Sequence, residues 1–541
     1  MNIFNYFKKA GIDTVDVSFY RKIDEWISWY NANVRRFTFY KVYTGRGTYK
    51  RCQRKSMNMA KKLSEDIADL LLNERVTITL SDDITDNFVW EVLEDNQFIV
   101  LGNDYQERKA YTGTVAYIPY LDDMEVDDAG NILSGKIRIN YVDAPNIYPV
   151  SWNNGRVIEC IFVFPHTVKR KKYLHLQSHL LMDGEYVIRN TVLSCVTGSA
   201  EGQELKEEEW RQLKPFATLA REVKTGSAEP QFVIDRLNIT NNADESNPMG
   251  VAIFANAIDT LKKLDVEYDS YCNEFELGRK RIFVAPELLT NEDGSPTFDP
   301  DEGVFYSLPE DYDKNKEGLI KDIDMTLRTE EHSKAISDDL NYLSLKCGFG
   351  TNRYQFVSSG IKTATEIISE NSDMYRMIKK HEIILEDALK QLIRIIIRLG
   401  IVLHNPLNPK SEIVIDFDDS IIEDKDTERK RDLQDMSAGI MSHAEYRAKW
   451  YGETLEEAEK NLPEQNAVMD DDVKIPISKN NSVGAQVQGK QLNGAQTQSL
   501  IAIMSQFSSG ELTEGQATNL IATAIGIDKD EARKILNGEV M

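Results

Sequence analysis

The sequence holds several residue groups whose types and spacing approach known catalytic patterns. Residues 484–491, Gly-Ala-Gln-Val-Gln-Gly-Lys-Gln, follow the phosphate-binding loop of nucleotide-binding enzymes up to the last position. That position needs a Ser or Thr hydroxyl to reach Mg²⁺, and this chain has Gln491. No strand pattern precedes the segment, which is rich in Gly, Gln and Asn. We therefore interpret it as a linker.

A second group, His175 and His179, has the spacing that on a helix would place two imidazoles on one face for zinc. The intervening Leu-Gln-Ser lacks the Glu of a metalloprotease, and the surrounding residues alternate as in a strand. Four residues of a strand span about 13 Å, too far for two ligands of one ion. We therefore expect surface histidines and no zinc site.

Carboxylates and thiols give no stronger signal. Paired aspartates at 122–123, 127–128 and 418–419 could hold a divalent cation, but Asp-Asp-Ala-Gly-Asn at 127–131 is typical of an exposed turn. The five cysteines are scattered and include no Cys-x-x-Cys pair, so neither a disulfide framework nor a zinc ribbon is predicted. No nucleophile and base can be paired. We expect a protein that is not an enzyme, with no cofactor and no metal.

Charge and length limit the function further. The 541 residues include 64 Lys and Arg against 88 Asp and Glu, a formal net charge of −24. Tight non-specific binding of nucleic acid depends on Lys and Arg, so this composition argues against a protein that grips DNA, although DNA could still pass nearby. The basic cluster at 169–172 could touch phosphates, but an exposed strand end or loop is the simpler interpretation.

The elements that would position any site follow from hydrophobic periodicity. The chain is long enough for several domains. Residues 17–75 show helical patterns, and from Val76 to about Ser194 the period changes to two, with hairpin turns at 153–155 and 183–184. The most apolar run, 389–403, is too short to cross a membrane and contains two arginines, so we expect a buried helix. The predicted fold class is α+β, mainly helical with a β-rich N-terminal lobe.

A helix is predicted to begin at Asn247 and Pro248, a capping residue followed by proline at the first helical position. Apolar residues then recur with the heptad spacing of a helix that packs against another helix. An ordinary amphipathic helix on a core is an equal alternative. Residues 278–322 then become polar, with β-like runs at 281–285 and 304–308, which predicts a hairpin-like insertion. The residues of the heptad seam are Phe254, Ala257, Leu261, Leu264, Tyr268, Tyr271 and Phe275.

Two helical patterns follow the insertion and flank a loop at 348–362 that is punctuated by glycines. Before the loop, an apolar stripe ends at Cys347. After it, Thr363-Ala-Thr-Glu366 has the hydroxyl and carboxylate of a capping box. The helix that starts there extends to about Leu399, roughly 36 residues or about 54 Å. Residues 426–462 are also predicted to be helical, and three short helices, 497–507, 513–525 and 528–536, follow a polar linker.

The order of helix, insertion, helix, loop and long helix resembles the portal proteins of tailed bacteriophages, in particular those of long-tailed phages of Gram-positive bacteria. The resemblance covers nearly the whole chain, and no single motif in it is catalytic. The segments that carry it are 23–30 (Ile-Asp-Glu-Trp-Ile-Ser-Trp-Tyr), 56–62, 70–74, 149–153, 362–372 and 437–447.

The resemblance implies an architecture of wing, stem, clip and crown. It places the wing at 1–247, stem helices at 248–277 and 323–347, the clip at 278–322, the tunnel loop at 348–362, a long channel-side wing helix at 363–400, the crown at 401–465, and a linker with a C-terminal helical extension at 466–541.

It also implies a ring, commonly a dodecamer, at one capsid vertex of the virion, made in the cytoplasm of the bacterial host. Such a ring passes double-stranded DNA in both directions with transient contacts, and it docks the terminase and the head–tail connector. It also works with the major capsid and scaffolding proteins during head assembly, without a membrane. The residues expected in the DNA channel are Asn352, Arg353, Gln355 and Lys362, and those expected between subunits are Phe254, Leu261, Leu264, Tyr268, Tyr271 and Phe275.

Two other classes stay open from the residues alone. One is a different structural virion protein, such as a head–tail adaptor or minor capsid protein, which would share the acidity but lack this order of elements. The other is a nucleic-acid-processing enzyme, which would need carboxylates clustered in a cleft.

Overall fold

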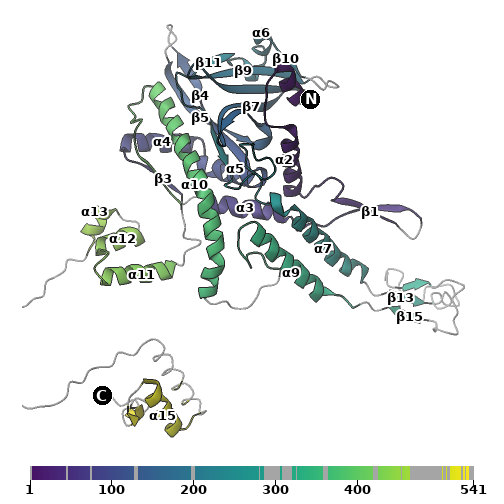
Figure 1. Ribbon diagram of the computed structural model, residues 1–541, viewed down its shortest axis with the longest axis vertical. Helices are drawn as coiled ribbons and strands as arrows, with labels where there is room; N and C mark the ends of the chain where they lie inside the picture. The colour runs from purple at the N-terminus through teal and green to yellow at the C-terminus, as the bar shows by residue number, and fades with distance from the viewer. Residues whose placement is uncertain are drawn as a thin grey trace, which may run out of the picture. The chain divides into compact units, whose positions relative to one another are not determined.

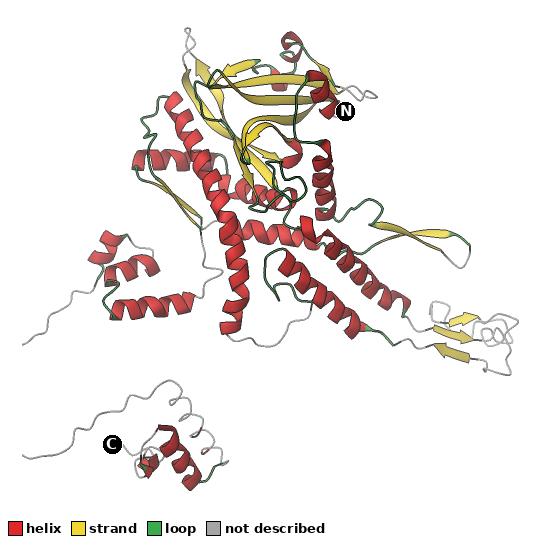
Figure 2. Ribbon diagram, viewed as in Figure 1, coloured by secondary structure: helices red, strands yellow, loops and turns green. Residues whose placement is uncertain are grey.

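The chain divides into two compact units, Met1–Trp450 and Tyr451–Met541, in a computed structural model of all 541 residues (Figure 1). Helices and sheets are both abundant (Figure 2), which agrees with the predicted α+β class. The structure describes residues 3–534 except 44–46, 74–75, 127–131, 196–201, 279–280, 285–304, 308–319, 324–325, 357–363, 418–424, 452–453, 463–502, 504–506, 508–511, 526–527 and 530–531.

The N-terminal helices differ in one respect from the prediction of helix over 17–75. Helices α1 (Ile3–Ala10), α2 (Val17–Tyr30) and α3 (Met59–Leu71) pack their apolar faces into the core. Between α2 and α3, however, strands β1 (Phe39–Tyr43) and β2 (Tyr49–Gln53) form an antiparallel hairpin. These strands contain aromatic residues and the β-branched Val42, which favour extended backbone, and Gly47 before β2 has a φ of +76°.

Two further helices lie where the sequence was predicted to alternate. After β3 (Thr77–Leu80), helices α4 (Asp83–Asp95) and α5 (Phe98–Thr112) occupy residues assigned above to the β-rich lobe. The Asp82 carboxylate caps α4 by accepting a hydrogen bond from the Thr85 amide at 2.9 Å. Helix α5 shows no clear apolar stripe because some of the side chains it buries, such as Gln106 and Lys109, are polar.

The β-rich lobe contains a six-stranded and a three-stranded sheet. The predicted turns are confirmed, because Gly155 and Gly184 both have positive φ and join adjacent antiparallel strands. The basic residues 169–172 lie at the turn between two strands, as predicted. The long strands are β4 (Thr114–Val126), β5 (Ile132–Asp143), β6 (Ile147–Asn153), β7 (Arg156–Val168), β8 (Lys171–Met182) and β9 (Glu185–Cys195), and the short ones are β10 (Gln203–Glu204), β11 (Glu222–Lys224) and β12 (Val233–Arg236).

Helix α7 (Ile258–Leu277) starts ten residues later than the helix predicted from residue 248. Tertiary hydrogen bonds hold the intervening segment in a non-helical path: Gly250 N donates to Thr114 Oγ1, and Ile253 N donates to the Ala110 carbonyl. Gly113 and Gly250 approach so closely here that a Cβ on Gly113 would lie 2.4 Å from the Gly250 oxygen. Tertiary contacts of this segment therefore outweigh the local helix-capping preference of Asn247 and Pro248.

The described residues of the insertion after α7 form three strands, which do not pair as a simple hairpin. Strands β13 (Arg281–Val284) and β14 (Phe305–Ser307) lie at the two predicted β-like runs, but they pair in parallel, and β15 (Ile320–Ile323) pairs antiparallel with β13. Because β15 extends to Ile323, helix α9 (Thr329–Lys346) starts later than the predicted residue 323.

Helix α10 (Ala364–Val402) confirms the long helix and buries the apolar run as predicted. Its capping residue Thr363 lies outside the described residues. In the described part of the chain no helix is long and apolar enough to cross a membrane. Strand β16 (Ile413–Asp416) pairs with β3, so the start of the segment assigned to the crown joins a strand of the segment assigned to the wing.

The predicted helical stretch 426–462 is divided into α11 (Lys425–Ser437), α12 (His443–Tyr451) and α13 (Leu455–Lys460). In the second unit, α15 (Glu514–Ile525) matches the second of the three predicted short helices. Ala517, Ile521 and Ala532 form a small core there.

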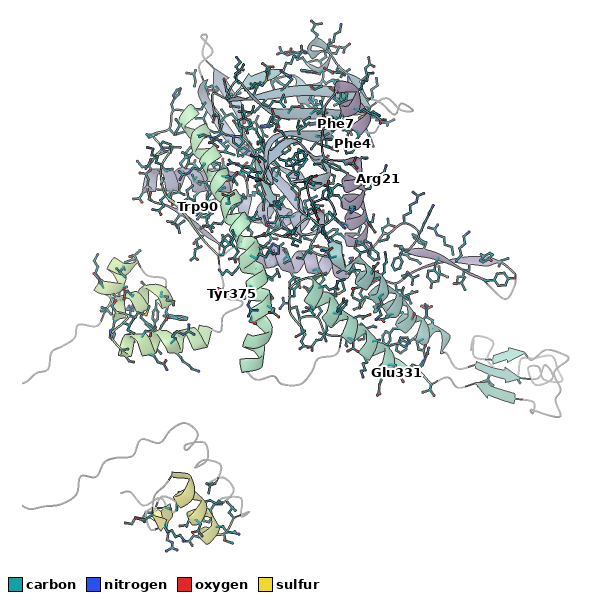
Figure 3. The ribbon with its side chains drawn as sticks, viewed as in Figure 1. Phe4, Phe7, Arg21, Trp90, Glu331 and Tyr375 are labelled. Carbon is teal, nitrogen blue, oxygen red and sulfur yellow. The ribbon has the colours of Figure 1, made fainter. Side chains whose placement is uncertain are left out.

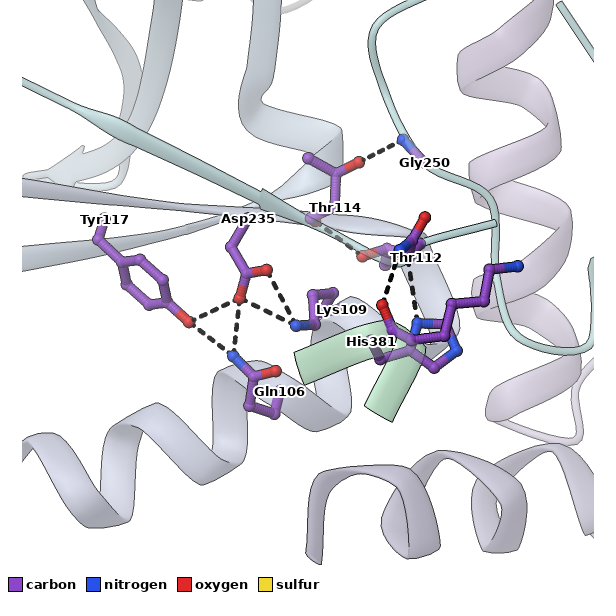
Figure 4. A network of polar contacts seen from close by, with 10 residues as sticks. Gln106, Lys109, Thr112, Thr114, Tyr117, Asp235, Gly250 and His381 are labelled. Carbon is purple, nitrogen blue, oxygen red and sulfur yellow. Dashed lines mark hydrogen bonds and ion pairs between the residues drawn. The ribbon is translucent and has the colours of Figure 1, made fainter. Parts of the chain in front are cut away.

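A polar network lies inside the core where α5 meets β4 and β12 (Figure 4). The Lys109 Nζ lies 2.9 and 3.0 Å from the two oxygens of Asp235, and both side chains are completely buried. Gln106 donates to the same carboxylate at 2.8 Å, and the Tyr117 hydroxyl lies 3.3 Å from it. Burial lowers the pKa of Lys109, which the adjacent carboxylate opposes. A buried charge pair of this kind is tolerated only when its partners stay in place.

Candidate functional site

Helices α7 and α9 lie side by side and carry the insertion at their far end (Figure 1), and we call this pair the arm. Charged contacts join the two helices along their length. Lys263 Nζ lies 2.8 Å from the Asp339 carboxylate, and Arg328 donates to both oxygens of Glu274 at 3.1 and 2.9 Å. The hydrogen bonds from Arg328 lower the pKa of Glu274 to about 2. The arm is therefore held by ion pairs near solvent as well as by apolar packing.

The six residues predicted between subunits fall into two groups along this arm. Phe254, Leu261 and Leu264 are buried in the core of their own chain. Tyr268 and Tyr271 are only partly buried, and Phe275 is 46% exposed. The seam therefore leads from the core toward solvent, and packing within one chain accounts for its first three residues.

The base of the β1–β2 hairpin is bound to α7 through two buried carboxylates. Asp265 accepts hydrogen bonds from the Ser56 hydroxyl and the Met57 amide, at 2.9 and 3.0 Å. Asp269 accepts from the Lys55 amide and the Tyr40 hydroxyl, both at 3.0 Å. Burial raises the pKa of Asp265, while the hydrogen bonds from Ser56 and Met57 favour its charged form.

The loop after α9 packs against the body through Tyr354. The Tyr354 hydroxyl donates to Asp66 of α3 at 2.6 Å, and burial together with that carboxylate raises the pKa of the phenol. Phe356 contacts the ring of Tyr271 on the arm, with centroids 5.6 Å apart. Gly348 has a φ of +86°, and a Cβ there would lie 2.8 Å from Met377 of α10. The described half of the loop, up to Phe356, is thus anchored on three elements.

The residues predicted to line a DNA channel are not gathered at one site by the described structure. Arg353 is exposed, next to the anchored Tyr354. Asn352 has a φ of +65°, its amide donates to Asn341 Oδ1 at 2.9 Å, and both Asn352 and Gln355 are partly buried. Lys362 lies outside the described residues.

The two histidines first considered as metal ligands lie in strand β8, as expected, but they are not on the surface. His179 is fully buried between the rings of Phe162 and Phe232, and His175 lies 2.8 Å from Asn190. Burial lowers the pKa of His175 to about 4 and that of His179 to about 3. Both are therefore neutral at pH 7. Strand alternation does not distinguish a buried face from an exposed one, which is why the sequence failed here.

No metal-binding group is found among the described residues, where no three His, Cys, Asp or Glu side chains lie close enough to hold an ion. The phosphate-loop-like segment 484–491 and the aspartate pairs at 127–128 and 418–419 lie outside those residues. The described residues around this region thus form a pair of helices, an insertion and an anchored loop.

The family comparison agrees with this class. Residues 12–470 match the family model described as phage portal protein, SPP1 Gp6-like. No curated protein matches the chain. Since the match covers well over half of the sequence, the chain belongs to this family of phage portal proteins.

Membership gives the general function. The chain is a structural protein of the phage virion that forms a ring-shaped oligomer, and it acts where the genome is packaged and released. The family is not an enzyme family. The predicted resemblance to a portal protein is therefore confirmed at the level of the family.

Proposed function

We propose that twelve copies form a ring at one capsid vertex of a long-tailed phage that infects a Gram-positive host, and that double-stranded DNA passes through its centre. The single observation that carries this proposal is the family match over 12–470. The order of arm helix, insertion, arm helix, anchored loop and long helix supports it. Negative-stain images viewed down the ring axis test it: closed rings are expected, and a monomer or an open filament would contradict it.

The arm corresponds to the proposed stem, with α7 and α9 as the two stem helices. The residues between them, with strands β13 to β15, correspond to the clip, and 348–362 to the tunnel loop. The N-terminal helices, the β-rich lobe and α10 form the proposed wing. The helices after β16 form the proposed crown, so we move its start to α11, because β16 belongs to a sheet with β3.

Charge supports transit rather than capture of DNA. Twelve copies of a chain with a formal charge of −24 carry 12 × −24 = −288. An acidic wall repels the phosphates of a duplex, and the cations needed to hold it tightly are too few. Arg353, exposed beside the anchored Tyr354, would supply weak contacts that shift as the duplex moves.

The loop proposal is tested by Arg353→Glu in phage particles. We expect rings and procapsids to form normally while the amount of packaged or retained DNA changes, since the loop fold depends on Tyr354 and not on Arg353. The matched control is Arg221→Glu, which reverses an exposed arginine elsewhere. Equal DNA content in both variants would show that the loop only joins two helices.

We further propose that the exposed end of the arm faces the neighbouring subunit, with Tyr271 and Phe275 in the contact. Phe275→Asp should reduce ring formation while the monomer stays folded, because this side chain is 46% exposed in one chain. Leu261→Asp places an unpaired charge in the chain's own core and should unfold the monomer instead. If Phe275→Asp still forms full-size rings, this end of the arm does not contact the neighbouring subunit.

The clip is proposed to dock the terminase during packaging and the head–tail connector afterwards, and the wing to contact major capsid and scaffolding proteins. The position of the clip at the far end of the arm supports the first part (Figure 1). Replacing the residues between β13 and β14 by a Gly/Ser linker should preserve rings and abolish binding to both partners. Normal pull-down of both by the variant would contradict it.

The alternatives give different outcomes in the same preparations. A nucleic-acid-processing enzyme would cleave DNA with Mg²⁺, and a head–tail adaptor would bind to preformed portal rings instead of forming the vertex channel itself. We expect neither.

A further inference from the structure

The β1–β2 hairpin combines exposed aromatic residues with a charge opposite to that of the rest of the chain. Between Glu25 and Glu65 the sequence contains ten Lys and Arg and no Asp or Glu, within a chain of net charge −24. Tyr43 is 63% and Tyr49 69% exposed. In Figure 1 the hairpin projects away from the body of the first unit.

The strand register places these groups on one face. Phe39 lies opposite Gln53, Lys41 opposite Arg51, and Tyr43 opposite Tyr49, and all six side chains are exposed. The Arg51 guanidinium lies 3.9 Å from the centre of the Phe39 ring. Like charges directly opposite each other destabilise a strand pair, so Lys41 and Arg51 favour an anionic partner between them.

The hairpin also needs a partner for its stability. A two-stranded hairpin without a covered face is only marginally stable in water. Here the base is fixed by Asp265 and Asp269 of α7, whereas the outer part has no cover in a single chain. A firmly fixed base and an uncovered apolar and cationic face are typical of an element that docks on another molecule.

A complementary surface lies on the opposite side of the same unit, where α4 meets α5. A hollow of about 220 Å³ there is lined mainly by apolar side chains, among them Trp90, Ile99 and Val100, together with Glu94. Val100 is 63% exposed, and the indole of Trp90 is fixed by a 2.8 Å hydrogen bond to the Ile78 carbonyl. Glu91 and Asp95 are exposed on the same helix, α4, on either side of Glu94 in the sequence.

We propose that in the ring the hairpin of each subunit docks on the α4–α5 hollow of the next, with Tyr43 and Tyr49 against the apolar lining and Lys41 and Arg51 near the carboxylates of α4. In a cyclic ring each contact joins two different faces of the subunit. Figures 1 and 3 place the hairpin and the labelled Trp90 on opposite sides of the first unit, as such a contact requires.

A second copy fits this face better than DNA does. A duplex offers phosphates to Lys41 and Arg51, but its bases are stacked and leave no apolar surface for Tyr43 and Tyr49. An acidic neighbour with an open apolar hollow satisfies both. The contact also places cations between chains that otherwise repel one another. This inference rests on the proposed ring.

Cross-linking locates the partner directly. A benzophenone amino acid at Tyr43 is irradiated in rings assembled from equal amounts of ¹⁴N- and ¹⁵N-labelled chains. We expect mixed-isotope cross-links to peptides within 83–104. Cross-links within one chain, to another segment, or only to added duplex DNA would overturn the proposal. Absence of rings in the unmodified protein would instead refute the proposed function.

Charge reversal tests the energetics. Lys41→Glu/Arg51→Glu should lower the fraction of chains in rings at least tenfold near the assembly midpoint, and adding Glu91→Lys/Glu94→Lys should restore much of it. Lys171→Glu/Lys172→Glu is the matched control, since it makes the same charge change at another exposed hairpin. Circular dichroism of the monomers verifies the fold. An equal effect in the control, or no rescue, would contradict the contact.

Discussion

The polar contacts inside the β-rich lobe and those along the arm use the same residue types in different surroundings. The Lys109–Asp235 pair is completely buried, whereas the Arg328 side chain of the Arg328–Glu274 pair is 67% exposed. In the core, water cannot replace a lost partner, so the pair fixes how α5 and β12 meet. On the arm, water and salt compete with the pair, so it adjusts easily. The lobe is therefore expected to be rigid and the arm adaptable.

Asp235→Ala should give the largest effect, because it leaves the Lys109 ammonium buried without its carboxylate. We expect a loss of about 3–5 kcal/mol in the free energy of unfolding. Urea denaturation of the monomer measures it. Glu222→Ala, which breaks the exposed Arg189–Glu222 pair at 3.2 Å, is the control and should cost less than about 1 kcal/mol. Similar losses in both would mean that the lobe is not fixed by its buried pair.

Gly113→Ala tests the lobe at its backbone. Gly113 and Gly184 have φ near +85°, but only at Gly113 would a Cβ meet backbone, 2.4 Å from the Gly250 oxygen, while Gly184 faces open space. Gly113→Ala should therefore cost about 1–3 kcal/mol more than Gly184→Ala, in the range of other overpacking changes. Equal urea midpoints would show that the 248–257 segment can move away.

Acid should weaken the lobe through His179. The pKa of His179 is about 6.5 in the unfolded chain and about 3 in the folded chain, so below pH 6.5 the unfolded chain binds more protons. The free energy of unfolding therefore decreases as the pH is lowered. From neutral pH to pH 5.5 the loss is about 1 kcal/mol for this one group. His179→Phe, which suits the aromatic surroundings, should lack that part of the loss. Parallel pH dependences of the two urea midpoints would contradict burial of a neutral imidazole.

Arg328→Ala should have the smallest effect. It removes an ion pair whose arginine is mostly exposed, so only a small coupling with Glu274→Gln is expected, decreasing further in high salt. A double-mutant cycle measures it. A coupling as large as the loss in Asp235→Ala that does not respond to salt would mean that the arm is as rigid as the lobe.

Sequence patterns predicted those helices in which buried apolar residues recur at regular helical spacing. Ile336, Leu340 and Leu343 of α9 are buried with the three- and four-residue spacing of the predicted apolar stripe that ends at Cys347, and α10 extends over the predicted range. The family resemblance was also recognisable, because it depends on the order of such elements. Neither needs knowledge of what lies opposite in the fold.

The failures share a different cause, namely contacts between residues distant in sequence. Helix α5 shows no helical period of apolar residues, because two of the side chains it buries are the polar Gln106 and Lys109, which donate to Asp235 of β12. Asn247 and Pro248 predicted the start of a helix. The segment stays non-helical because Gly250 and Ile253 donate hydrogen bonds to Thr114 and Ala110 instead. The hairpin at 39–53 was missed between two strong helical patterns, although its run of cations without acids was visible in the sequence. The oligomer and channel residues remain predictions, since their partners are other molecules.

Helix α10 also has a mechanical consequence. Its 39 residues form a rod about 58 Å long. Hydrogen bonds hold it from its middle onward, where His381 accepts from the Asn238 amide, Arg394 donates to the Pro409 carbonyl, and Arg398 donates to the Pro230 carbonyl. A rod clamped over one half acts as a lever, because a sideways load at the Ala364 end becomes a torque on the β-rich lobe. A force on the Ala364 end of α10 would thus load the β-rich lobe at the other end of the helix.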